Sequence, residues 1–225
     1  MKTSSLDCIE IGSEHAERAI IWLHGLGADG HDFEPIAQEL NFAPEIQIRF
    51  IFPSAPKRNI TVNAGVSMPA WYDVLDMDFT NHEDEEGIHT SQQQIEQLIE
   101  NEHQRGIKYE NIILAGFSQG GAIALQTALR FKYPLAGIMA LSTYLPLAST
   151  LEKEASNANK LIPIFQAHGT HDPVILLSWA EDTRYILEQF GYHTEYYSYR
   201  MEHGVHPDEI QHIKHWILKT FKLDQ

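Results

Sequence analysis

The sequence contains only one cysteine, Cys8, among its 225 residues. A single cysteine forms no internal disulfide, which is typical of proteins in a reducing compartment. The sequence also has no run of about 18 apolar residues that could cross a membrane as a helix. Its first residues, MKTSSLDCIEIG, lack the apolar stretch and the small-residue cleavage site of a secretion signal. We therefore expect a cytoplasmic protein that makes at most transient contact with a membrane surface.

Positive charge is also scarce. The 16 Lys and Arg residues stand against 31 Asp and Glu, which gives a formal net charge of −15 with neutral histidines. Such a surface repels phosphate backbones, so we expect no nucleic-acid partner. Part of the acidic excess lies in residues 83–86, with the sequence EDEE, which we expect to be a solvated loop rather than a binding site.

The rest of the composition suits one globular unit. Hydrophobic residues make up 43% of the chain, enough for one large core, and no repeat or Pro/Gly/Ser-rich linker divides it. We expect a single domain over residues 1–225. Short apolar runs predict strands at residues 6–11, 19–23, 46–52, 111–115, 135–141, 161–167 and 193–199. Apolar residues at helical spacing predict helices at residues 33–40, 90–105, 119–131, 176–190 and 207–221, and residues 54–87 are expected to be largely irregular.

The alternation of these segments predicts the fold class. Strands separated by helices of about a dozen residues pair in parallel through right-handed crossovers. Strands such as IILA and IMAL do not alternate between apolar and polar residues, as expected where helices cover both faces of a sheet. We predict an α/β protein, a three-layer α/β/α sandwich with a mostly parallel sheet of about seven strands. Functional sites of such sheets lie at the carboxyl ends of the strands.

One of these strand ends carries a nucleophile candidate. Residues 116–120, GFSQG, place Ser118 in a G-x-S-x-G motif between a predicted strand and a predicted helix. In a nucleophile elbow the glycines leave room for a sharp turn, and the Gln119 amide at the helix start can stabilise an oxyanion. A glycine-rich turn with an N-capping serine is the alternative. A phosphate-binding turn is less well supported, because the P-loop lysine and the G-x-G-x-x-G pattern are absent.

A nucleophilic serine needs a histidine base and an acid that orients it. Asp172 follows both Ser118 and a predicted strand, although it could also belong to an ordinary Asp-Pro turn. His203 and His206 both follow the last predicted strand. His203 lies nearer the strand end and precedes a glycine, whereas His206 precedes a proline and fits the start of the final helix. The residues alone favour His203 and leave His206 open.

The glycine-rich segment after the second strand, HGLGADG at residues 24–30, offers a second oxyanion donor, for which we nominate the Leu26 amide. We expect His24 to satisfy backbone groups of this loop. Three histidine pairs are spaced i, i+3, but no H-E-x-x-H or Cys-His zinc pattern occurs. We therefore expect neither a metal nor a cofactor.

Taken together, the motifs resemble those of the carboxylesterase and acyl-protein thioesterase family of α/β-hydrolases. The resemblance is carried by IIWLHGLGADGHDF, RFIFPSAP, MPAWYD, NIILAGFSQGGAIAL, IMALSTYLP, HGTHDPV and MEHGVHPDEI. It implies an α/β-hydrolase fold with Ser118 as nucleophile, Asp172 as acid and His203, rather than His206, as base. It also implies oxyanion donors at the amides of Leu26 and Gln119.

The resemblance further implies substrates: carboxylic esters with short to medium acyl chains, lysophospholipids or S-acylated proteins. The chain departs from the family pattern at Glu202, where similar proteins usually carry glycine, and at Arg200. We expect the Glu202 carboxylate beside the base to point to solvent. A domain that keeps this fold but only captures acyl chains is the non-catalytic rival, and the complete set of three triad residues argues against it.

A candidate acyl groove comes from apolar residues in the irregular segment. Met68, Trp71 and Tyr72 could form one wall together with Val66, Met77 and Phe79, and Leu145 and Leu147 could form the facing wall. The alternative is that these residues belong to the core or to an interface between two copies in a homodimer.

Overall fold

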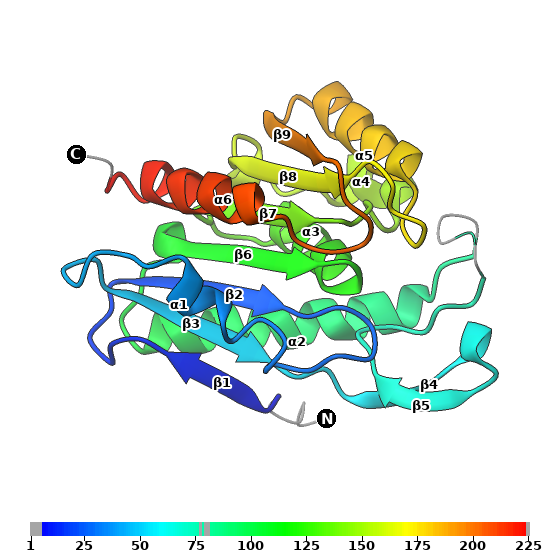
Figure 1. Cartoon of the computed structure of the whole chain (residues 1–225), viewed down its shortest axis with the longest axis horizontal. Coiled ribbons are helices and arrows are strands. Elements are labelled where there is room, and N and C mark those ends of the chain that lie inside the picture. The colour runs from blue at the N-terminus through cyan, green and yellow to red at the C-terminus, as the bar shows by residue number, and fades with distance from the viewer. Residues whose placement is uncertain (1–5, 77, 79–81, 224–225) are drawn as a thin grey trace.

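A computed structural model of the chain describes residues 6–76, 78 and 82–223. Within these residues the chain builds a seven-stranded sheet with the order β1-β3-β2-β6-β7-β8-β9 (Figure 1). The strands are β1 (Cys8–Ile11), β2 (Arg18–Leu23), β3 (Ile48–Pro53), β6 (Ile112–Phe117), β7 (Gly137–Leu141), β8 (Ile164–Gly169) and β9 (Thr194–Tyr199). Strand β1 pairs with β3 in antiparallel orientation, and the other pairs of this sheet are parallel. The predicted fold class is confirmed.

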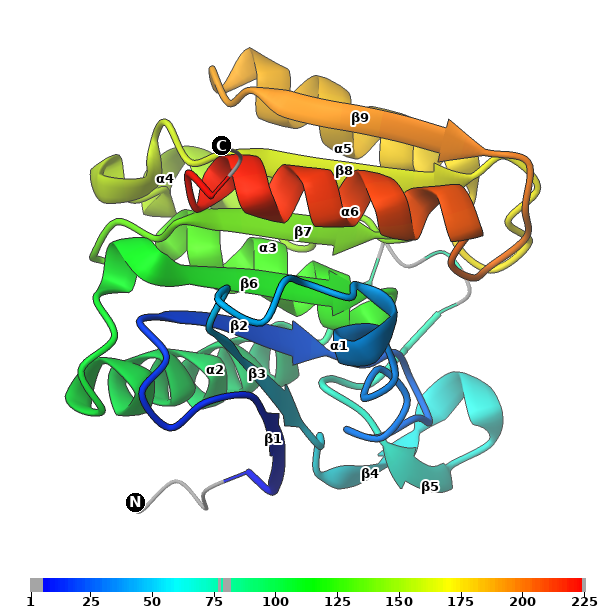
Figure 2. The ribbon, with the colours of Figure 1, turned by 60° about the vertical axis from the view of Figure 1, so that its left-hand side comes forward.

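Helices cover both faces of the sheet. Helices α1 (Ile36–Glu39) and α6 (Pro207–Thr220) lie on one face (Figure 2), and α2 (Glu85–Gln104), α3 (Gln119–Arg130), α4 (Leu151–Glu154) and α5 (Leu177–Gln189) lie on the other. Strand β2 explains why the apolar runs do not alternate. Ile20 and Trp22 pack on the α1–α6 face, while Ile21 and Leu23 pack on the α2–α3 face. Both sets of side chains are buried, so both faces need apolar residues.

Two expectations about the first half of the chain were wrong. The segment expected to be irregular contains an antiparallel hairpin of β4 (Lys57–Ile60) and β5 (Val66–Pro69) beyond the carboxyl ends of β2 and β3. Its strands are short and partly exposed, so their sequences show no clear apolar alternation. The helix expected at residues 33–40 is reduced to the single turn of α1.

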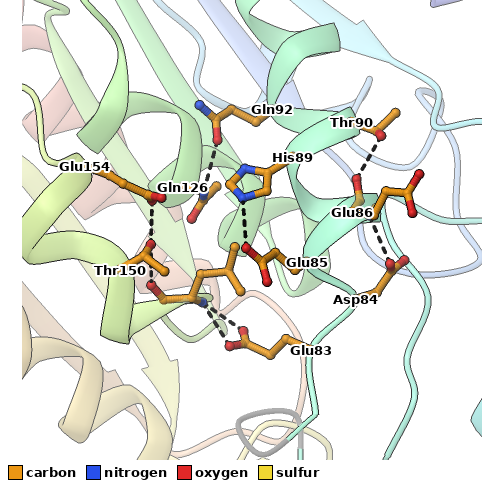
Figure 3. Close-up of polar contacts among 12 residues, drawn as sticks. Glu83, Asp84, Glu85, Glu86, His89, Thr90, Gln92, Gln126, Thr150 and Glu154 are labelled. Atoms are coloured by element: carbon orange, nitrogen blue, oxygen red, sulfur yellow. Dashed lines mark hydrogen bonds and ion pairs between the residues drawn. The ribbon is translucent and has the colours of Figure 1, made fainter.

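The acidic run at residues 83–86 was expected to be a solvated loop, and this is also wrong because helix α2 begins within it. Asp84 is the N-cap, and its carboxylate accepts a hydrogen bond from the Gly87 N–H at 3.0 Å. Glu83 is half-buried and accepts the Leu147 N–H at 2.9 Å, and Glu85 lies 3.7 Å from the His89 ring (Figure 3). Carboxylates are favourable at a helix N-terminus because they pair with its free N–H groups and its dipole.

None of the helices in the described residues is long and apolar enough to cross a membrane.

Candidate active site

Ser118 stands between β6 and α3 in a conformation that few residues adopt. Its backbone angles are φ +54° and ψ −122°. Such a conformation costs about 1–3 kcal/mol and persists only where the surroundings hold it. Here the Ser118 N–H donates to the Leu141 carbonyl at 2.9 Å, and the Ser118 carbonyl accepts the Thr143 hydroxyl at 2.7 Å. The predicted strand–turn–helix elbow is present, and residues from β7 and the loop after it hold it in place.

The two motif glycines are required by space. A Cβ on Gly116 would lie 2.3 Å from the Gly120 carbonyl carbon, and a Cβ on Gly120 would lie 2.4 Å from the Leu23 carbonyl oxygen. Both contacts are with backbone, which cannot move aside as a flexible side chain can. The elbow therefore packs directly against the end of β2, where the glycine-rich loop begins.

Asp172 and His203 form a close pair at the same edge of the sheet. The His203 Nδ1–H donates to Asp172 Oδ2 at 2.6 Å, and Asp172 Oδ1 accepts the N–H groups of Val174 and Ile175 at 2.8 and 3.0 Å. Burial raises the pKa of Asp172, but the hydrogen bonds from His203 and the backbone outweigh it, so this pKa lies below its usual value. The acid is therefore held as a carboxylate that orients the imidazole.

The structure places His203 beside the elbow. Its ring centroid lies 4.7 Å from that of Phe117, the residue before Ser118. The next residue, Gly204, accepts a hydrogen bond at 3.4 Å from Ser142, which follows β7. Because Nδ1 is used by Asp172, the Nε2 atom of this tautomer carries the lone pair that a base needs.

His206 has the structural role that its position before a proline suggests. It is the N-cap of α6, where its Nδ1 accepts the Asp208 N–H at 3.2 Å and its own N–H donates to the Glu209 carboxylate at 3.1 Å. This reciprocal pair is a capping box. Glu202 is exposed, as expected.

The glycine-rich loop that carries Leu26 is fixed from several directions. The His24 Nδ1–H donates to the Gly25 carbonyl at 2.7 Å, and its Nε2 accepts the Ala55 N–H at 3.0 Å. Burial lowers the pKa of His24, which favours this neutral form and confirms the expectation that His24 serves the loop backbone. The Gly27 N–H donates to the Pro69 carbonyl at 2.9 Å, which ties the loop to the β4–β5 hairpin.

The two nominated oxyanion donors lie on either side of the elbow. Gln119 is the first residue of α3, and the Leu26 amide belongs to the loop whose Gly25 faces Ser118; a Cβ on Gly25 would lie 3.4 Å from Ser118 Cβ. Among the described residues no hydrogen bond involves the N–H of Leu26 or that of Gln119. Both N–H groups therefore remain available to a developing oxyanion.

Comparison with known proteins shows the family of the chain. The phospholipase/carboxylesterase family model matches residues 5–221 of the chain. The chain belongs to the phospholipase/carboxylesterase family. This confirms the resemblance found in the sequence and, with it, the hydrolase class.

Relatives in this family match over nearly the whole chain. Acyl-protein thioesterase 1 of Kluyveromyces lactis is 36% identical over 228 residues, covering 97% of this chain and 99% of the relative. The crystal structure of Arabidopsis thaliana SOBER1 superposes with a TM-score of 0.87 at 30% identity, covering 92% of this chain and 100% of that one. Zea mays acyl-protein thioesterase 2 superposes with a TM-score of 0.83 at 28% identity, covering 95% of this chain and 98% of that one.

The residues proposed for an acyl groove have different surroundings. Trp71 is fully buried in the core, and its indole N–H donates to the His24 carbonyl at 2.9 Å. Tyr72 is buried as well, with its hydroxyl 2.9 Å from that of Tyr144. The core alternative therefore describes Trp71 and Tyr72. Met68 is partly buried and packs with hairpin residues near Leu26, so a substrate contact by Met68 stays a prediction. Met77 and Phe79 lie outside the described residues.

Leu145 lines a cavity of about 550 Å³ on the β7 side of the elbow. The walls of this cavity include Tyr144, Leu145, Ala148, Trp179 and Ile186, with Glu83 as an acidic member. Burial raises the pKa of the Glu83 carboxyl. Tyr144, the first of these wall residues in its loop, directly follows Thr143, whose hydroxyl bonds the Ser118 carbonyl.

Sequence reasoning missed two side chains at the site. The Gln119 side chain holds the buried backbone of Trp71 and Tyr72, accepting the Trp71 N–H and donating to the Tyr72 carbonyl, each at 2.8 Å. His168 is fully buried beside the acid, with Nε2 3.6 Å from Asp172 Oδ2 and 2.8 Å from the Ile175 carbonyl. Its place four residues before Asp172 was the only sequence signal for this contact.

Proposed function

We propose that this chain hydrolyses acyl esters and thioesters, including those of S-acylated proteins, through a triad of Ser118, His203 and Asp172. The observation that carries the proposal is the 2.6 Å pair of Asp172 and His203 beside a serine held in an elbow conformation. The names of the relatives, acyl-protein thioesterases, support the thioester class of substrate.

The proposed reaction follows from the positions of these groups. Ser118 Oγ attacks the acyl carbonyl carbon while His203 Nε2 accepts its proton, and the amides of Leu26 and Gln119 stabilise the oxyanion. The bond from the carbonyl carbon to sulfur or oxygen then breaks, and His203 returns the proton to the leaving thiol or alcohol. Water attacks the acyl-enzyme with His203 as base, which releases the carboxylic acid and restores Ser118. Asp172 stabilises the cationic imidazole during both formation and hydrolysis of the acyl-enzyme.

The test compares hydrolysis by the wild type and Ser118→Ala. We expect Ser118→Ala to remain folded and to lose about four or more powers of ten in turnover on both oxygen esters and thioesters. A fluorophosphonate probe should label the wild type at Ser118 and leave the variant unlabelled. A folded Ser118→Ala protein that retains full turnover on p-nitrophenyl butyrate would refute the proposal.

We further propose that the cavity beside Tyr144 and Leu145 holds the acyl chain. Its volume lies within the usual range of small-ligand sites. Its lining combines apolar side chains such as Leu145, Trp179 and Ile186 with the polar residues Glu83, Ser149, Asp182 and Thr183. Ala148→Phe places a ring in this cavity and should shift the preferred chain in a series of p-nitrophenyl esters toward shorter acyl groups. Ala158→Phe makes the same change at an exposed position and should leave the series unchanged. An unchanged series in Ala148→Phe would place the acyl chain elsewhere.

A further inference from the structure

A second cavity, of about 430 Å³, has the proposed base, His203, in its lining. Its lining includes Phe33, Ile36, Phe117, His203, Asp32 and Glu39. Its lining contains residues of α1 and α6, whereas the lining of the cavity beside Tyr144 contains residues of α5. The two cavities share no lining residue. Under the proposed function, in which the cavity beside Tyr144 takes the acyl chain, the second cavity is a separate space for the other half of the substrate.

The position of His203 indicates which half enters this second cavity. In the proposed reaction, His203 returns a proton to the sulfur or oxygen that leaves, so this atom has to lie within hydrogen-bond reach of the imidazole. His203 is itself part of the cavity lining, as is Phe117, whose ring lies 4.7 Å from the imidazole. The group attached to the leaving atom therefore extends into this cavity.

Two acidic residues, Asp32 and Glu39, belong to the lining of this cavity. Asp32 and Glu39 are exposed, and no ion pair or side-chain hydrogen bond within the described residues involves either carboxylate. The sequence contains no Lys or Arg between Arg18 and Arg49. The nearest histidine in the sequence, His31, is paired with Glu34 at 2.8 Å. Both carboxylates are thus without an ion-pair partner in the described part of the chain, while the lysine that α6 brings to this segment, Lys214, donates to the Asn41 carbonyl at 2.8 Å.

The aromatic residues of the lining are a second feature that suits cations. The Phe33 and Phe117 rings lie 5.6 Å apart at an angle of 44°. Aromatic faces attract the planar guanidinium of arginine and the ammonium of lysine. A lining that combines aromatic rings with carboxylates is therefore complementary to a positively charged chain.

As a refinement of the proposed function, we propose that this cavity binds the leaving half of the substrate, and that Asp32 and Glu39 select peptides with lysine or arginine beside the S-acylated cysteine. Both carboxylates line the cavity, so each can pair with a cation of the bound chain. A lysophosphatidylcholine headgroup fits less well, because its phosphate would meet this acidic lining on a chain of net charge −15. The occupant to which we commit is a basic peptide.

The experiment compares two synthetic S-octanoyl-cysteine peptides, one with arginines flanking the cysteine and one with citrulline in their place. Citrulline keeps the size of arginine and removes its charge, so the ratio of kcat/KM for the two peptides reports charge selection alone. Two partly exposed ion pairs should favour the arginine peptide by about 2- to 30-fold at low ionic strength. The preference should appear mainly in KM and should shrink at high salt, because the cations bind away from the reacting bond.

A matched pair of variants assigns the effect to the cavity. In Asp32→Asn/Glu39→Gln the ratio should fall close to one. The control Glu14→Gln/Glu45→Gln removes the same charge from exposed positions outside the cavity lining and should keep the wild-type ratio. If the control loses the preference equally, net charge rather than the cavity makes the selection, and the inference is overturned.

Failure of the inference can be told apart from failure of the proposed function. If the wild type hydrolyses both peptides equally through Ser118, the charge selection is wrong and the hydrolase proposal stands. If neither peptide nor p-nitrophenyl butyrate is hydrolysed, both fail. A third pair of substrates, octanoylthiocholine and its uncharged 3,3-dimethylbutyl analogue, tests a small ammonium group. If only this pair shows charge selection, and Asp32→Asn/Glu39→Gln abolishes it, the occupant is a small ammonium group and not a basic peptide.

Discussion

Replacement of Gln119 by alanine tests how the site is held together. Gln119 is 5% exposed, and its side-chain amide bonds the backbone of two other buried residues. Its Oε1 accepts the Trp71 N–H and its Nε2 donates to the Tyr72 carbonyl, both at 2.8 Å. Gln119→Ala leaves the backbone amide in place, so the proposed oxyanion donor itself is not removed.

The expected cost follows from the two backbone groups that lose their partners. Trp71 is 0% exposed and Tyr72 is 3% exposed, so water has little access to either group. A buried polar group left without a partner costs about 1–3 kcal/mol, which gives about 2–6 kcal/mol for the pair. The Trp71 indole N–H also donates to the His24 carbonyl in the glycine-rich loop that carries Leu26. A shift of this segment should therefore lower kcat as well as stability.

Urea unfolding of the wild type and Gln119→Ala measures the stability difference, and p-nitrophenyl butyrate hydrolysis measures the effect on the rate. Gln126→Ala is the matched control, because Gln126 is fully buried on the same helix but its side-chain amide donates only to the Gln92 side chain. We expect the control to cost clearly less and to keep its rate. A Gln119→Ala protein destabilised by less than about 1 kcal/mol would refute this reasoning.

Three further predictions concern the histidines and the buried carboxyl groups. His203→Ala should lower turnover by about four or more powers of ten, whereas His206→Ala should keep most of it and lose about 0.5–2 kcal/mol of stability as a helix cap; the reverse pattern in esterase assays would exchange their roles. The pKa of Asp172 is lowered in the fold, so its stabilisation is present above the unfolded pKa of about 3.9 and is lost as the pH falls through the folded value. Acid titration should therefore show a shallower loss of stability below about pH 4 in a folded Asp172→Asn protein than in the wild type, and equal slopes would contradict this. Burial raises the pKa of Glu209 to about 7, so the free energy of unfolding should fall by up to about 3 kcal/mol between about pH 4.5 and 7. Urea titrations at pH 5 and 8 measure this change, and Glu209→Gln should reduce the difference in the free energy of unfolding between the two pH values. If the difference is the same as in the wild type, groups other than Glu209 cause it.

The sequence predicted those parts of the molecule whose signals are local. Strand β6 is a continuous apolar run followed by G-x-S-x-G, and the small residues at Gly116 and Gly120 are needed for the backbone contacts that the elbow makes. His206 likewise carries a local signal, since a residue before a proline and three positions before a glutamate is typical of a helix start.

The parts that sequence reasoning missed depend on contacts between distant segments. The β4–β5 hairpin is anchored by bonds such as Gly27 N–H to the Pro69 carbonyl, and residues 42 positions apart leave no periodic pattern. The side chain of Gln119 bonds residues 47 and 48 positions away. Local spacing identified Gln119 for its amide, because that role follows from the helix start, and gave no sign of the second role.

Gln119 thus joins two structures that the proposed reaction needs in fixed relation. Its backbone continues the elbow, where strain at Ser118 is held by Leu141 and Thr143 on the β7 side. Its side chain accepts the Trp71 N–H, and the Trp71 indole N–H donates to the His24 carbonyl in the glycine-rich loop that carries Leu26. An oxyanion site stabilises a transition state only when its donors are already aimed before charge develops. Gln119 belongs to the elbow through its backbone and holds the Trp71 segment through its side chain. Ser118 and the glycine-rich loop that carries Leu26 therefore cannot move apart without breaking buried hydrogen bonds.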